Sequence, residues 1–118
     1  MTAKEIYENA LALNMSHIED EDDLEYYALK LLNIMLAETC VYNNQIREKK
    51  GLPPVDVPVV KDMEDEVGFE GEMLSPLCYS LASKLLQAQE ETGLAAIYYN
   101  QYISLLQFFV PAVPVEVV

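Results

Sequence analysis

The stretch that decides the fold of this chain is LEYYALKLLNIMLAETCVYNNQI, residues 24–46. Apolar or small side chains recur in it every three or four residues over about six turns, which is the pattern of one face of an amphipathic helix. This face consists of Tyr27, Ala28, Leu31, Leu32, Met35, Leu36, Thr39, Tyr42 and Ile46. Asp22 or Asp23 can cap the start of the helix, and Gly51 with the prolines after it can end it. One long helix is therefore predicted as the backbone of the fold.

Two shorter helices are predicted on either side of this long one. The first covers residues 3–14, because Thr2 and Glu5 have the spacing of a capping box and apolar residues follow at helical spacing. The third helix is expected to begin with Ser75 as its cap, or a turn earlier near Glu72. An apolar face then continues along it to Ala88.

A fourth helix is expected after a turn and cap at Thr92 and Gly93, and Pro111 ends it. Together these elements predict a mainly α fold, a four-helix bundle in a single domain of residues 1–118. The core is expected to consist of Leu31, Leu32, Met35, Leu77, Leu81, Leu85, Tyr102 and Leu105.

Two extended segments complete the prediction. Residues 55–60 are rich in valine and predict a short β-like arm, which Pro58 confines to an edge, and an acidic loop follows to residue 71. Residues 110–118 predict an extended apolar tail. Both segments need a partner for their backbone groups, so a neighbouring subunit is expected to cover them, although the tail could instead fold back on its own bundle. The candidate interface residues are Val57, Val59, Val60, Tyr99, Val113, Val115 and Val117.

The composition indicates a folded but strongly acidic protein. Of the 118 residues 52% are hydrophobic, too many for a disordered chain, and the net charge is −13. Nucleic acid is expected to be repelled, because affinity for phosphate comes from Lys and Arg. No apolar run is long enough to span a bilayer, and Lys4, Glu5 and Glu8 stand where a signal peptide has its apolar stretch. Neither secretion nor a membrane contact is expected.

Residue types for catalysis or metal binding are sparse. His17 is the only histidine, and its polar surroundings predict a surface position. Cys40 and Cys78 sit among apolar residues and predict two buried free thiols, which suit a reducing cytoplasm. The acidic runs 19–23 and 62–72 lack the glycine and ligand positions of a calcium loop. We therefore expect no enzyme activity, metal or cofactor, and we expect the chain to bind other protein.

Five stretches carry a resemblance to a known protein family. Residues 3–14 resemble its short first helix, and residues 28–38 (ALKLLNIMLAE) resemble its long second helix with a Leu-Leu-Asn core. Residues 51–66 are similar to its extended arm. Residues 74–82 (LSPLCYSLA) resemble its third-helix signature, and residues 98–102 (YYNQY) resemble the aromatic start of its last helix. The family is that of the head-to-tail connector, or adaptor, proteins of tailed bacteriophages and prophages.

This resemblance implies a structural subunit of the virion, although Ser80 departs from the family's third-helix string. Such connectors assemble as homo-oligomeric rings beneath the portal, extend the DNA channel used in packaging and dock the tail-completion proteins. The location implied is the host bacterial cytoplasm during assembly and then the virion. An acidic channel would let DNA slide without sticking, so no sequence-specific nucleic-acid binding is expected. The alternative is a small acidic regulatory or inhibitor module, in the manner of a DNA mimic.

Overall fold

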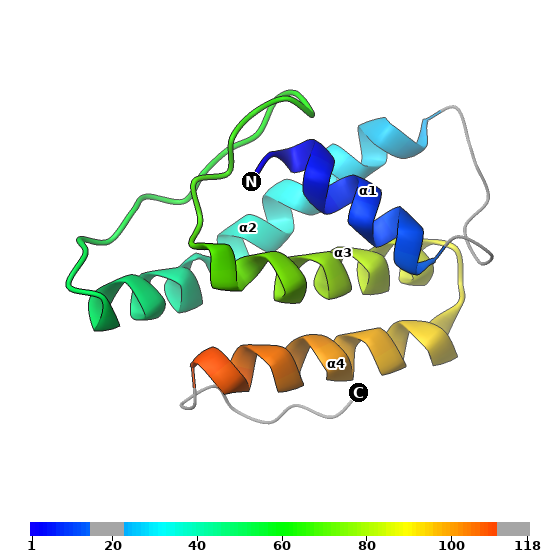
Figure 1. Cartoon of the computed structure of the whole chain (residues 1–118). Coiled ribbons are helices and arrows are strands. Elements are labelled where there is room, and N and C mark those ends of the chain that lie inside the picture. The colour runs from blue at the N-terminus through cyan, green and yellow to red at the C-terminus, as the bar shows by residue number, and fades with distance from the viewer. Residues whose placement is uncertain (15–22, 111–118) are drawn as a thin grey trace.

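The structure is a computed structural model that describes residues 1–14 and 23–110 (Figure 1). Its helices are α1 (Ala3–Leu13), α2 (Leu24–Lys49), α3 (Leu74–Ala88) and α4 (Thr92–Phe109), and a short 3-10 turn, η1 (Gly71–Met73), precedes α3. The prediction of a mainly α fold with four helices, the second being the longest, is confirmed.

The central helix of the bundle is α3. The other three helices all pack against it, and α1 and α4 lie on opposite sides of it (Figure 1). Leu77, Leu81, Leu85 and Leu86 of α3 are almost completely buried. A helix that is apolar on several faces is stable only when it is surrounded. The long helix α2, predicted as the backbone of the fold, is therefore one of three helices that surround α3.

The core contains most of the residues predicted for it. Six of the eight are buried, while Leu31 and Leu105 are only partly buried. Leu31 still packs against the core, whereas on α4 the neighbouring Leu106 is the fully buried leucine. The reason is that α4 packs mainly against α3, so only a narrow side of α4 turns inward.

The ends of the helices show which capping signals act. Thr2 and Glu5 form the predicted capping box at the start of α1. Asp23 precedes α2 but makes no side-chain capping hydrogen bond, and Asp22 lies outside the described residues. The alternative of an earlier start for the third helix is confirmed, since Ser75 lies inside the first turn of α3. Thr92 is likewise the first residue of α4 and makes no capping bond.

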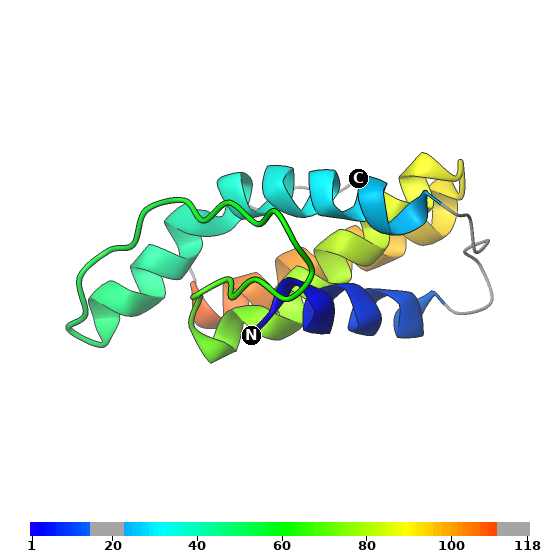
Figure 2. The same ribbon diagram turned by 90° about the horizontal axis from the view of Figure 1, so that it is seen from above.

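Residues 55–60, which we call the strap, are not the strand that was predicted. Within the described residues the only β-type pairing is an isolated bridge between Thr2 and Glu66. The strap instead runs back along α2 (Figure 2). The side chains of Asn33 and Asn44 hold its two ends through hydrogen bonds. Helix side chains thus supply the hydrogen bonds that a neighbouring strand would otherwise provide.

The acidic loop after the strap is also part of the packed structure. The backbone N–H of Ala3 donates to the carbonyl of Asp65 at 3.0 Å, and that of Lys4 donates to Met63 at 2.8 Å. Three apolar side chains of the loop, those of Met63, Val67 and Phe69, are buried in the core. The loop therefore closes over the start of α1 and leads directly into η1 and α3.

Candidate protein interface

The predicted interface residues lie in different environments. Val57 and Val59 on the strap are exposed, with 48% and 68% of their surface accessible. Val60 is only 2% exposed, because Asn33 fixes its backbone and its side chain enters the core. Tyr99 lies half-buried on α4. Val113, Val115 and Val117 lie outside the described residues.

A feature that sequence reasoning missed is the absence of charge on α4. None of its 18 residues is Asp, Glu, Lys, Arg or His, although the whole chain contains 20 acids and 7 bases. Four positions on one side, Ile97, Gln101, Ser104 and Phe108, follow one another at intervals of four, three and four residues and are exposed. The exposed fraction reaches 62% at Ile97 and 80% at Phe108. We call this row the α4 stripe.

A row of apolar side chains lies on the outer side of α2. Tyr27, Ile34 and Val41 are each more than half exposed and are separated by seven residues. A spacing of seven residues brings side chains back to nearly the same side of a helix. This row lies away from the core, and nothing in the described part of the chain covers it.

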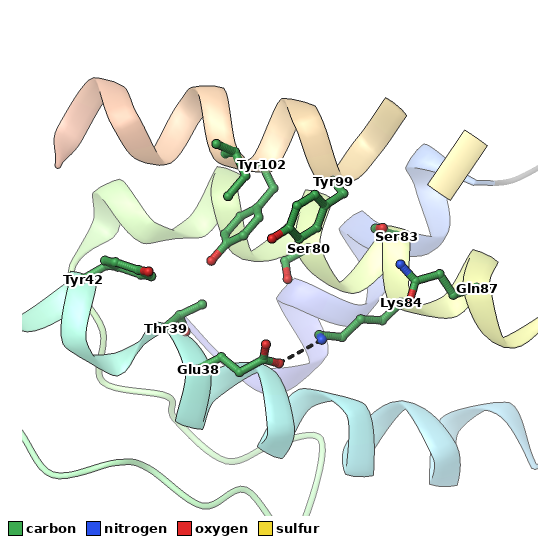
Figure 3. A pocket seen from close by; sticks show the side chains of 10 residues that line it. Glu38, Thr39, Tyr42, Ser80, Ser83, Lys84, Gln87, Tyr99 and Tyr102 are labelled. Atoms are coloured by element: carbon green, nitrogen blue, oxygen red, sulfur yellow. Dashed lines mark ion pairs between the residues drawn. The ribbon is translucent and has the colours of Figure 1, made fainter. Parts of the chain in front are cut away.

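Between α2 and α4 lies a groove whose floor is α3 (Figure 3). Tyr99 and Tyr102 form the α4 wall, and Tyr42 and Thr39 belong to the α2 wall. The hollow between them has a volume of about 310 Å³. The groove is therefore lined by aromatic rings and hydroxyl groups from three helices.

One ion pair crosses this groove. The Lys84 ammonium lies 2.8 Å from the Glu38 carboxylate, and the Glu38 side chain is 56% exposed (Figure 3). On the floor and the α2 wall the hydroxyls of Ser83 and Thr39 donate to backbone carbonyls at 2.7 Å and 2.8 Å. These hydroxyls are held in place by the helices, and no imidazole stands among the lining residues to activate them as nucleophiles. The groove is suited to binding a segment that offers polar groups and side chains able to pack on aromatic rings.

Much of the acidity between residues 61 and 72 is neutralised inside the molecule. Glu70 lies 3.0 Å from the Arg47 guanidinium and 3.2 Å from the Lys50 ammonium. Lys50 also reaches Glu72 at 2.7 Å, and the hydrogen bond between them raises the pKa of Lys50 and lowers the pKa of Glu72. Glu66 pairs with the N-terminal ammonium at 3.0 Å. These acids hold the loop to α1 and α2.

The two cysteines are buried and free, as predicted. Burial raises the pKa of the Cys78 thiol to about 11 and also raises that of Cys40. A thiol with a raised pKa is a poor nucleophile and a poor metal ligand at neutral pH. Among residues 1–14 and 23–110 no group of His, Cys, Asp or Glu is arranged to hold a metal ion.

No protein-family model, no curated protein and no solved structure matches the chain. The helices of the described part of the chain are all too short or too polar to cross a membrane. The α4 stripe and the groove thus have to be interpreted from their own chemistry. The sequence signal that would have found the α4 stripe is the uncharged run from Thr92 to Phe109.

Proposed function

We propose that this chain is a structural subunit that binds other copies of itself, of the head-to-tail connector type that its sequence resembles. The observation that carries the proposal is the α4 stripe. Ile97 and Phe108 expose most of their surface on an uncharged helix of a protein with a net charge of −13. The cores of protein interfaces are depleted in charge and enriched in aromatic residues.

The remaining surface supports assembly rather than nucleic-acid binding. Ile97 and Phe108 on α4, with the exposed row on α2, present large apolar side chains that a contact between copies would cover. A net charge of −13 opposes nonspecific association, so contacts are restricted to the uncharged surfaces, α4 among them. A ring of such acidic subunits would repel phosphate along its channel, as a conduit for DNA requires. In this proposal the portal and the tail-completion proteins bind the two ends of the ring.

The alternative, an acidic module that imitates DNA, has less support. A mimic has to present its carboxylates to the basic groove of a target. In this chain Glu66, Glu70 and Glu72 are paired with cations of the same molecule. The acidic loop of residues 61–72 is therefore partly neutralised before any partner arrives.

The proposal is tested by measuring molecular mass in solution over a range of concentrations. We expect the native chain to form oligomers, and we expect Ile97→Asp and Phe108→Asp to shift it towards the monomer. Leu52→Asp, which adds a charge at a residue that is 41% exposed and outside α4, is the matched control. Equal assembly of all three variants would show that α4 is not the contact. Portal and tail genes beside the coding gene would support the connector type in particular.

A further inference from the structure

We propose that the groove between α2 and α4 receives residues 111–114 (PAVP) from a second copy of the chain. This inference rests on the self-assembly proposed above and adds to the α4 stripe a second contact between copies. Tyr42, Tyr99 and Tyr102 form the aromatic part of the groove, and the tail carries two prolines in the spacing Pro-x-x-Pro. Proline-rich segments in the polyproline II conformation bind to grooves lined by aromatic residues.

The chemistry of the groove matches such a segment. A polyproline II chain makes no internal hydrogen bonds, so all its carbonyl groups need donors. Ser80, Lys84 and Gln87 on the floor carry donor groups, and the tyrosine rings offer flat apolar surfaces to proline. Lining residues of this mixed kind are unsuited to a purely apolar ligand.

The size of the hollow also favours an extended segment. Its volume of 310 Å³ is near the lower end of the range of about 300–1,000 Å³ for small-ligand pockets. A polyproline II chain has three residues per turn, so Pro111 and Pro114 lie on the same side of it and can enter the hollow together.

The position of the tail in the chain points to a second copy as its source. Val110 is 2% exposed and directly follows α4, whose own wall lines the groove. To enter the groove of its own molecule, the chain would have to reverse direction at once. A reversal takes four residues with proline favoured at the second, so Pro111 would be used in the turn and the Pro-x-x-Pro unit would be lost. A segment arriving from another copy needs no such turn.

The charges of the two partners are complementary. Residues 111–118 contain one charged side chain, Glu116. In a polyproline II conformation eight residues would extend over about 25 Å at ~3.1 Å per residue. The groove contains one cation, Lys84, whose present partner Glu38 is mostly exposed. With Pro114 against the tyrosines, Glu116 lies about 6 Å further along the groove and can replace Glu38 as the partner of Lys84.

Each donor and acceptor is used once in this arrangement, so the contact is heterologous. A heterologous contact repeated from copy to copy closes into a ring or continues as a filament. The groove variant Tyr99→Ala and the tail variant Pro111→Ala/Pro114→Ala should each weaken assembly at least tenfold, measured from the concentration dependence of the mass. Tyr26→Ala, which removes an exposed tyrosine of α2 far from the groove lining, should leave assembly unchanged.

The decisive experiment mixes the groove variant with the tail variant, both as full chains whose helicity is verified by circular dichroism. The groove variant keeps its tail and the tail variant keeps its groove, so exchange between copies predicts that the mixture forms a 1:1 pair that neither variant forms alone. Because Tyr99→Ala could disturb packing, Lys84→Glu serves as a second groove variant, and Glu116→Lys in the same chain should restore its assembly.

The outcomes separate the contact between groove and tail from the proposed self-assembly as a whole. Assembly that is unaffected by every groove and tail variant overturns this inference and leaves the proposed self-assembly standing. A cross-link between the tail and Tyr99 of the same molecule also overturns it, if the mixture of the groove variant and the tail variant forms no 1:1 pair. A native chain that is monomeric at the highest concentration reached overturns both proposals.

Discussion

Asn33 holds Val60 to α2 through two hydrogen bonds of 2.8 Å each, one donated by the asparagine amide and one accepted by it. Asn44 binds Val55 in the same way, at 3.0 Å and 2.9 Å. The asparagines are eleven residues apart on a helix that rises ~1.5 Å per residue, which gives about 16 Å. The valines are five residues apart in extended chain at ~3.3 Å per residue, which also gives about 16 Å. The two spacings match, so the strap lies taut along the helix.

Replacing Asn33 by alanine should lower the free energy of unfolding by about 1–3 kcal/mol, because the partly buried N–H and C=O of Val60 lose their partners. Urea unfolding followed by circular dichroism measures the change. Asn100→Ala, at a half-buried asparagine of α4 whose side chain has no hydrogen bond to another described residue, is the control and should cost less. An Asn33→Ala protein as stable as the native chain would mean that the strap adds nothing to stability.

Substitutions of the two adjacent leucines near the end of α4 test how that helix packs against the core. Leu106 is completely buried and Leu105 is only partly buried. Leu106→Ala should cost about 2–5 kcal/mol because a cavity remains, while Leu105→Ala should cost roughly 1 kcal/mol or less. Similar losses from the two substitutions in urea unfolding would show that α4 is rotated from the described position.

The helices could be predicted because their signals are local. The capping box of Thr2 and Glu5, the long apolar face of α2 and the glycine and prolines after it act within a few turns of chain. The rotation of a helix about its axis is not local, since it depends on which neighbours it packs against. For this reason Leu105 was expected in the core where Leu106 lies.

The strap and the groove could not be predicted because each combines distant parts of the chain. The valines of residues 55–60 favour a strand, but two asparagine side chains of α2 satisfy both ends of the segment. The groove takes residues from α2, α3 and α4, whose spacing in sequence gives no sign of their meeting. Val60 was assigned to the surface for the same reason, since valine on an extended segment can face either side.

Cys78 should be protected from alkylation in the folded protein. Burial raises the pKa of its thiol to about 11, so at pH 8 almost no thiolate is present. We expect labelling by iodoacetamide to be slow in the native state and fast in urea, as read by mass spectrometry of the peptides. Rapid native labelling of Cys78 would contradict its burial.

The same thiol links stability to pH. Its pKa is higher in the folded protein than the ordinary value of 9.0, so the folded state keeps a proton that the unfolded state releases. The contribution of this thiol to the free energy of unfolding is fully present below pH 9.0 and is lost as the pH rises towards about 11. As the pH rises from 9.0 to about 11, the free energy of unfolding of the Cys78→Ala variant should therefore fall less than that of the native chain.

Glu70 should be the acid of the loop that matters most for stability. Its side chain and that of Arg47 are 17% and 16% exposed at a separation of 3.0 Å, whereas Glu64 is 75% exposed and lies 3.8 Å from Lys4. Glu70→Gln leaves the Arg47 guanidinium without its charge partner in a partly buried position, so we expect a loss of about 1–3 kcal/mol. Glu64→Gln, the matched control, should change stability by less than about 0.5 kcal/mol because exposed ion pairs contribute little.

The pH dependence of this cluster follows from the shifts at Glu72 and Lys50. The pKa of Glu72 is lowered from 4.5 by its hydrogen bond to Lys50, so its contribution is present above pH 4.5 and is lost as the pH falls through the folded value. The pKa of Lys50 is raised from 10.5 by Glu72, so its contribution is present below pH 10.5 and is lost above it. Urea unfolding at pH 7 and pH 3 should thus show a smaller effect of Glu72→Gln in acid. An equal effect at both pH values would mean that the glutamine disturbs packing at the start of α3 and that the ion pair contributes nothing.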